Sequence, residues 1–153
     1  CYDFSYIDRF MNLGSVKADL GVPDSQVWYD CNNTVGKFMA EHDWRKNAAP
    51  LFKELLASGL KVLMYHGDLD LICNWMGGVS AAESFDWWGK EGFKNSQWKS
   101  CGYGLRREFG NFAFIKVSMA GHMVPMDQPE NAAKMLKWFI EKPNSGGQAG
   151  DSG

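Results

Sequence analysis

The chain has 153 residues, of which 45% are apolar and 22% charged, a balance typical of a globular protein with a buried core. Lys and Arg number 16 and Asp and Glu 18, so the formal net charge is −2, which argues against a nucleic-acid partner. No apolar run is long enough to span a bilayer, and no basic, apolar signal segment opens the chain, so no membrane association is expected. Because the chain begins at Cys1 rather than Met, we expect a processed or truncated product.

The first part of the chain is predicted to be helical and then irregular. Short helices are expected over residues 6–13 and 15–20, and Gly21 and Pro23 end the second of them. Residues 24–47 are polar with scattered aromatic side chains, so we expect mostly loop there.

Helices and strands then alternate. Pro50 is expected to open a helix that Gly59 ends. Residues 60–65 are short and apolar, like a buried parallel strand, and this strand leads into a loop over residues 67–70. A further helix is expected over residues 74–85.

The last part of the chain is predicted to contain a hairpin and a helix. Residues 86–97 are expected to form a loop rich in aromatic side chains. Residues 98–108 and 112–117 are predicted strands joined by a turn at residues 110–111, and Pro129 opens the final helix.

This order of elements is typical of an α/β fold, in which helices cover a sheet. Reactive groups in such sheets lie on loops just beyond the carboxyl ends of strands, and Asp70 and His122 both occupy that position. They could be two members of a Ser-His-Asp triad, in which a carboxylate orients the imidazole that takes a proton from serine. From position alone, a capping aspartate and an ordinary loop histidine remain the alternative. His42 and His66 are interpreted as surface or loop histidines.

Four cysteines occur, and their spacing argues against a metal cage: Cys1, Cys31, Cys73 and Cys101 include no C-x-x-C pair. We therefore expect no metal and no cofactor. Four cysteines allow three pairings, between which the sequence cannot choose. The sequon that begins at Asn32 directly follows Cys31, which makes Asn32 a candidate glycosylation site and favours a secretory history.

Two longer motifs surround the candidate pair. Residues 63–77 (LMYHGDLDLICNWMG) resemble the acidic-residue motif of the serine carboxypeptidase family, and residues 120–129 (AGHMVPMDQP) resemble its histidine motif. Weaker likeness covers nearly all of the chain except residues 86–111 and the tail. The resemblance implies an α/β-hydrolase fold, of which this chain is the C-terminal portion: the last sheet strands with flanking helices, completed by an N-terminal chain.

Carried over residue by residue, the resemblance makes Asp70 the triad acid and His122 the general base of an enzyme that removes C-terminal amino acids from peptides. Asp68 is the competing aspartate, and we interpret it as structural, bonding loop amides. Cys73 matches the family's unpaired cysteine beside the site. Met123 matches a methionine of the pocket for the leaving residue, although ordinary packing would also explain a methionine here.

The family's nucleophile lies in Gly-x-Ser-x-Gly, a pentapeptide that this chain lacks. The nearest string, residues 78–82, lacks the last glycine and falls inside a predicted helix. The family's oxyanion hole and carboxylate-binding acids also belong to upstream sequence. We therefore expect residues 1–142 to be the C-terminal part of the hydrolase domain, as a processed light chain or a proteolysed piece, and residues 143–153 to be a flexible tail.

The resemblance further implies a heavy chain that carries the serine and is disulfide-linked through Cys1 or Cys31, with Cys73 free and Cys101 without a clear counterpart. It also implies a lysosomal, vacuolar or extracellular location, and it allows a homodimer of the full enzyme. An acyltransferase or an inactive protective relative of the same fold remains an alternative. So does a transferase whose metal site would be formed by Asp68 and Asp70.

Overall fold

The computed structural model describes residues 2–44 and 46–143, which belong to two compact units, Cys1–Lys46 and Asn47–Gly153. The predicted flexible tail falls almost entirely outside the described residues, as does Cys1. Among the described helices, none has the length and apolar character needed to cross a bilayer.

The first unit contains helices α1 (Ser5–Met11), α2 (Gly14–Asp19) and α3 (Asn33–His42). The first two confirm the predicted short helices. The third lies in a segment predicted to be loop, so that prediction was wrong. Its start is set by Asn32, whose side-chain oxygen accepts hydrogen bonds from the backbone N–H groups of Thr34 and Val35. The cap thus gives hydrogen-bond partners to backbone N–H groups of the first turn, which have no partner within the helix.

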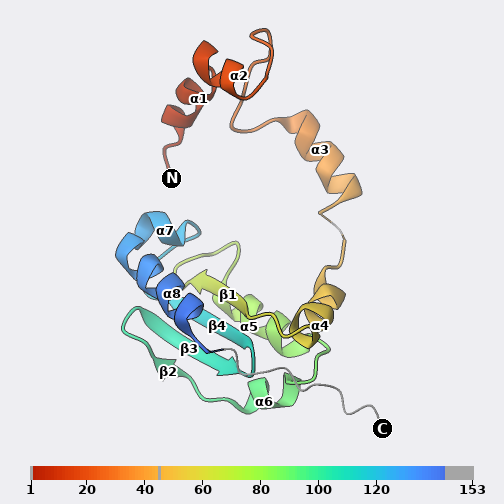
Figure 1. Ribbon diagram of the computed structural model, residues 1–153, viewed down its shortest axis with the longest axis vertical. Helices are drawn as coiled ribbons and strands as arrows, with labels where there is room; N and C mark the ends of the chain where they lie inside the picture. Colours follow the sequence, from red (N-terminus) through yellow and green to blue (C-terminus); the bar gives the residue numbers. More distant parts are fainter. Residues whose placement is uncertain (1, 45, 144–153) are drawn as a thin grey trace. The chain divides into compact units, whose positions relative to one another are not determined.

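The second unit is built on a mixed sheet with strand order β1-β4-β3-β2 (Figure 1). Strand β1 (Val62–Gly67) runs parallel to β4 (Phe112–Val117), which is antiparallel to β3 (Gly104–Phe109). The short β2 (Lys99–Ser100) pairs antiparallel with β3. This mixed sheet with flanking helices confirms the predicted α/β class.

The segment after residue 97 differs from the prediction in one detail and agrees with it in another. The single strand expected over residues 98–108 is divided into β2 and β3, because Gly102 and Gly104 adopt positive φ angles of 79° and 156° that turn the chain between them. The expected turn at residues 110–111 is present. There, the buried Asn111 side chain donates hydrogen bonds to the carbonyl oxygens of Leu56 and Leu60, which ties the turn to helix α4 (Ala49–Ala57) and to the segment that follows it.

Helices cover both faces of the sheet. In Figure 1, α7 and α8 lie to one side of the strands and α4, α5 and α6 to the other; their bounds are Ala49–Ala57 (α4), Trp75–Ser84 (α5), Lys90–Asn95 (α6), Val124–Asp127 (α7) and Pro129–Glu141 (α8). The helices expected from Pro50, over residues 74–85 and from Pro129 are confirmed. The expectation of only loop over residues 86–97 was wrong, because α6 forms within it and buries Phe93.

The core lies on both sides of the central strand β4. Side chains alternate along a strand, so Ile115 and Val117 pack toward Met135 of α8. Phe112 and Phe114 face the other way, into a group of buried side chains that we name the aromatic cluster: Leu56, Ala82, Trp87, Phe93, Phe112 and Phe114. Burial on both faces explains why β4 is almost continuously apolar.

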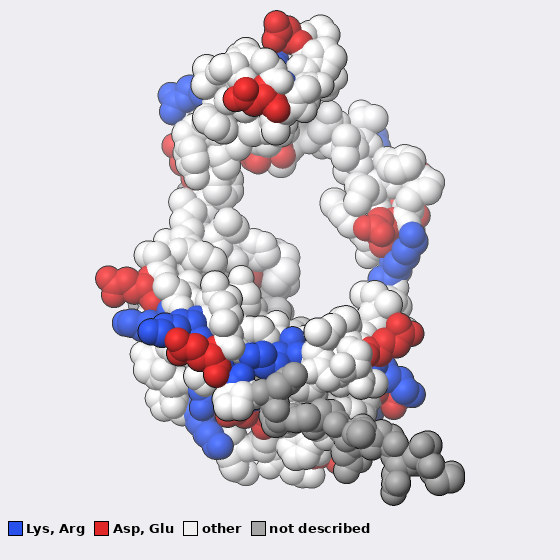
Figure 2. Space-filling model, viewed as in Figure 1, with Lys and Arg blue, Asp and Glu red and all other residues white. Residues whose placement is uncertain are grey.

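Charges on the second unit are mixed in sign. In Figure 2, acidic and basic side chains lie in small interspersed groups on the face in view. A group of ion pairs joins β3 to the end of α8: Lys142 Nζ lies 2.6 Å from Glu108 Oε2, and Arg106 Nε lies 3.2 Å from Glu108 Oε1.

Candidate active site

The parallel pairing of β1 and β4 brings two loops to one edge of the sheet. Gly67 and Val117 are register partners, and the two strands end at this pair. The loop after β1, residues 68–74, carries Asp70, and the loop after β4, residues 118–123, carries His122. We name these the acid loop and the histidine loop. Adjacent parallel strands direct both loops to the same end of the sheet, where α/β proteins place reactive groups.

Asp70 and His122 form a hydrogen-bonded pair, with His122 Nδ1 2.9 Å from Asp70 Oδ2. The other carboxylate oxygen of Asp70 accepts the backbone N–H groups of Ile72 at 3.0 Å and Cys73 at 3.1 Å. The Asp70 side chain is only 5% exposed, whereas that of His122 is 60% exposed. The pair thus has a buried acidic end, held by its own loop, and an imidazole that reaches the surface.

The electrostatics of the pair fix the proton arrangement. The hydrogen bond with His122 holds the pKa of the Asp70 carboxyl below its ordinary value, against the burial that would raise it, and the N–H groups of Cys73 and Ile72 add to the lowering. An ionised carboxylate can only accept hydrogen bonds, so His122 Nδ1 must carry the proton. In the neutral imidazole, Nε2 then has a free lone pair and can take a proton from a neighbouring hydroxyl.

Asp68, the competing aspartate, has a different partner. Its Oδ1 accepts the backbone N–H of Met119 in the histidine loop at 2.8 Å. This contact agrees with the interpretation of Asp68 as a residue that bonds loop amides. Both aspartate side chains thus contact the histidine loop. Asp68 bonds a backbone N–H of that loop, and Asp70 bonds the imidazole of His122.

Cys73 and Met123 flank the pair. The thiol of Cys73 is exposed and makes no disulfide within the part of the chain that the structure describes. One potential ligand atom from each of Asp70, Cys73 and His122 lies within 4.8 Å of the others, so these residues are also the candidates for holding a metal ion. Two of the three already bond one another. Met123 is half-buried and caps the start of α7, directly after His122.

The remaining candidate residues lie away from this pair in the sequence. Asn32 is exposed, and its cap of α3 uses Oδ1, whereas N-glycosylation modifies the side-chain nitrogen. Cys31 is exposed and unpaired within the described residues. Cys101 is half-buried, its thiol bonds the Gly104 carbonyl at 3.3 Å, and burial raises its pKa.

Two residues that support the site were not identified from the sequence. His66 lies in β1, stacks on Phe114 with ring centroids 5.4 Å apart, and donates from Nδ1 to the Cys73 carbonyl at 2.7 Å. Asp127 accepts the backbone N–H of Gly121 through Oδ2 at 2.7 Å. Asp127 lies inside the histidine motif, which is the one signal that points to it. The predicted strand ended before His66, so the interpretation of His66 as a surface or loop histidine was wrong: it is half-buried within β1.

Comparisons with known proteins agree with this architecture. The family model described as serine carboxypeptidase matches residues 1–142. A serine carboxypeptidase-like protein of Oryza sativa subsp. japonica is 42% identical over 144 residues, which cover 90% of this chain and 33% of that protein. Carboxypeptidase Y of Candida albicans is 37% identical over 147 residues, covering 92% of this chain and 27% of that protein.

A solved structure is similar as well. The crystal structure of Kex1(delta)p, a prohormone-processing carboxypeptidase from Saccharomyces cerevisiae, matches with a TM-score of 0.73 and 25% identity. The match covers 93% of this chain and 33% of that one. The chain therefore spans about a third or less of the length of the relatives it matches. Together with the family model, these matches establish that the chain belongs to the serine carboxypeptidase family.

Proposed function

We propose that this chain supplies the acid and the base of a serine-type carboxypeptidase, which removes C-terminal amino acids from peptides through an acyl-enzyme. The observation that carries the proposal is the bond of 2.9 Å between His122 Nδ1 and Asp70 Oδ2, in a member of this family. Asp70 holds the imidazole with Nε2 unprotonated and stabilises the imidazolium that forms during the reaction.

The chemistry requires a hydroxyl from sequence outside this chain. The serine Oγ attacks the scissile carbonyl, its proton passes to His122 Nε2, and the same proton then protonates the departing amine as the C–N bond breaks. Water then attacks the resulting ester and gives a proton to His122 Nε2, which returns it to the serine Oγ as the acyl C–O bond breaks and the shortened peptide leaves as its carboxylic acid. Met123 directly follows His122 in the sequence, and the fold brings the Cys73 thiol within 4.8 Å of ligand atoms of Asp70 and His122. Both side chains are proposed to contact the leaving residue.

The proposal includes the partner and the compartment. A companion chain of the same enzyme would carry the serine, the oxyanion hole and the carboxylate-binding acids, linked to this chain through Cys1 or Cys31. Disulfides persist in oxidising compartments, so the assembled enzyme would belong to the secretory pathway, with Asn32 glycosylated. Peptide mapping without reduction tests this arrangement, and a bridge between Cys1 and Cys31 would contradict it.

Labelling of the native enzyme with a serine-reactive fluorophosphonate tests the central proposal. After reduction and separation of the chains, mass spectrometry should find the adduct on a serine of the companion chain. An adduct on a serine of this chain, or full activity of this chain alone, would overturn the proposal. Turnover of glucose esters without peptide turnover would favour the acyltransferase, and inhibition by a chelator without labelling would favour a metal-dependent transferase.

A further inference from the structure

The acid and histidine loops are joined by several bonds besides the one between Asp70 and His122. The backbone N–H of Asp68 donates to the Val117 carbonyl at 2.9 Å, and that of Leu69 donates to the Ala120 carbonyl at 2.9 Å. At the strand end, Gly67 lies so close to the histidine loop that a Cβ there would overlap the carbonyl oxygens of Ala120 and Gly121. The backbones of the two loops are therefore in direct contact.

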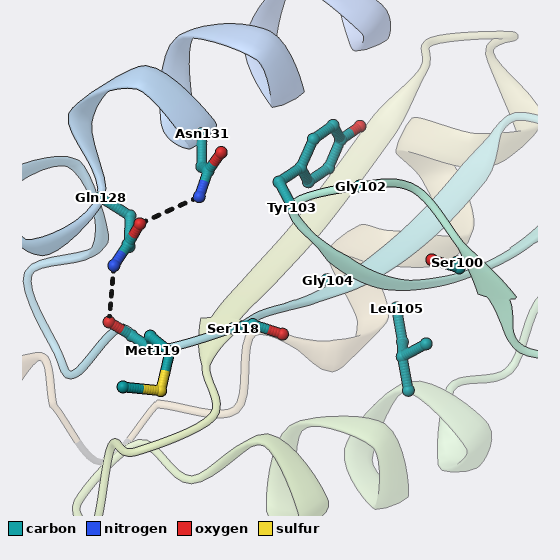
Figure 3. A pocket seen from close by; sticks show the side chains of 9 residues that line it. All are labelled: Ser100, Gly102, Tyr103, Gly104, Leu105, Ser118, Met119, Gln128 and Asn131. Carbon is teal, nitrogen blue, oxygen red and sulfur yellow. Dashed lines mark hydrogen bonds between the residues drawn. The ribbon is translucent and has the colours of Figure 1, made fainter.

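Asp68 holds the histidine loop at its point of reversal. Among the described residues, Met119 is the one non-glycine residue with a positive φ, at 57°. Side chains with a Cβ disfavour this conformation, so neighbouring contacts must hold it in place. The Met119 N–H donates to Asp68 Oδ1 at 2.8 Å. The Met119 carbonyl accepts from Gln128 Nε2 at 3.0 Å, a bond drawn in Figure 3. Both polar groups of the Met119 backbone are thus fixed.

Asp127 holds the same loop from the opposite end. Its Oδ2 accepts the backbone N–H of Gly121, the residue directly before His122, at 2.7 Å. Asp127 is the last residue of α7, and Gln128, which bonds Met119, follows it. The backbone leading into His122 is therefore held by a carboxylate from each side, one from the acid loop and one from α7.

These contacts fix where the imidazole sits. The His122 side chain is 60% exposed, so little packing by this chain restrains its ring, and its position depends on the loop backbone and on the bond to Asp70. We propose that Asp68 and Asp127 are positioning residues for His122: each holds a backbone N–H of the histidine loop so that Nδ1 meets Asp70 and Nε2 faces the reacting hydroxyl. This inference rests on the proposed function for its kinetic consequences.

Alanine variants of both residues and an asparagine variant of Asp68, made in the full enzyme, test the inference. Because a displacement of about 1 Å can lower turnover roughly 100-fold, Asp68→Ala and Asp127→Ala should lower kcat by about 10- to 100-fold. KM should change little, since neither Asp68 nor Asp127 is proposed to contact the peptide. Asp68→Asn keeps an oxygen that can accept the Met119 N–H, so it should restore most of kcat. Asp86→Ala, which removes an exposed carboxylate paired with Lys53, is the matched control and should leave kcat unchanged.

A second readout does not depend on turnover. The proton between His122 Nδ1 and Asp70 should give a far-downfield NMR resonance in the wild-type enzyme, and Asp70→Ala should abolish it. Asp68→Ala and Asp127→Ala should shift or broaden this resonance, whereas Asp68→Asn and Asp86→Ala should keep it. An enzyme that shows the resonance but no serine labelling would refute the proposed function while still allowing the positioning test.

The inference would be overturned by alanine variants that keep wild-type kcat and the wild-type resonance, even if they unfold more easily. If an alanine variant does not fold, Asp68→Glu and Asp127→Glu provide the comparison, because they keep a carboxylate but move it by one methylene. Positioning predicts a lower kcat and a shifted resonance in these variants. Wild-type values for both would overturn it.

Discussion

The two loops at the carboxyl ends of β1 and β4 differ from the aromatic cluster in how they are held together. The loops are held in place mainly by directional hydrogen bonds, such as that from Met119 N–H to Asp68 of the acid loop and that from Gly121 N–H to Asp127 of α7. The aromatic cluster is held by burial of apolar surface, and Phe93, Phe112 and Phe114 are fully buried in it. Burial has no preferred direction, whereas a hydrogen bond weakens steeply with misalignment. The cluster therefore supplies stability, and the loops supply geometry.

The strongest test of this division is Asp70→Asn. The amide would retain a similar shape, but it could present its NH₂ group to His122 Nδ1 and favour the wrong tautomer of the imidazole. We expect kcat to fall by about 10⁴-fold with little change in the free energy of unfolding. Steady-state kinetics together with urea denaturation measure both quantities. A large loss of stability with a small loss of turnover would show that Asp70 acts mainly on the fold.

The opposite result is expected for Phe93→Ala in the aromatic cluster. The ring of Phe93 is fully buried, and its centroid lies 4.9 Å from that of Phe112. The Arg107 guanidinium lies over the Phe93 ring, with Cζ 4.8 Å from the centroid. Its removal should lower the free energy of unfolding by about 3–5 kcal/mol. Turnover per labelled active site should stay near the wild-type value, and a 100-fold drop would mean that the cluster also sets the loop geometry.

Gly67→Ala should affect both properties, because it places a methyl group where the two loops touch. The new Cβ would overlap the Ala120 and Gly121 carbonyl oxygens, which are backbone atoms and can move only if the histidine loop moves. We expect a stability loss of roughly 1–3 kcal/mol and a lower kcat. Gly36→Ala in α3 is the control, since a Cβ there meets no atom within 4 Å. Equal behaviour of the two variants would contradict the close contact.

The smallest effect is expected at Glu108, away from both regions. Burial would raise the pKa of its carboxyl, but Lys142 and Arg106 outweigh burial and lower it below the ordinary value of 4.5. A lowered pKa in the folded state means that the stabilisation is present above the unfolded value and is lost as pH falls below it. Glu108→Gln should therefore cost roughly 1 kcal/mol at neutral pH and almost nothing once the pH lies below the lowered pKa of the folded state. Urea denaturation at several pH values measures this difference, and a constant difference would contradict it.

Much of the architecture follows from local sequence. Pro and Gly mark the ends of helices because of their restricted and permissive φ angles, which correctly predicts α4 and the start of α8. Apolar runs predict β1 and β4, and both chemistry-bearing residues follow these strands directly. The motifs around them also identified the family. Helix α3 was missed because its cap, Asn32, lies among polar residues that are equally typical of loops.

Spacing alone did not decide which aspartate meets the histidine: the family resemblance favoured Asp70, and the tertiary structure shows its contact with His122. Asp68 and Asp70 are two residues apart, and spacing alone could not separate them. The parallel register that pairs Gly67 with Val117 sets the distance between the loops, and the contacts after it direct Asp68 to Met119 N–H and Asp70 to His122. The contribution of Asp127 also depends on how α7 folds back on the histidine loop. Local sequence determines where a loop begins, but the direction of each side chain depends on the strand or helix that packs beside it.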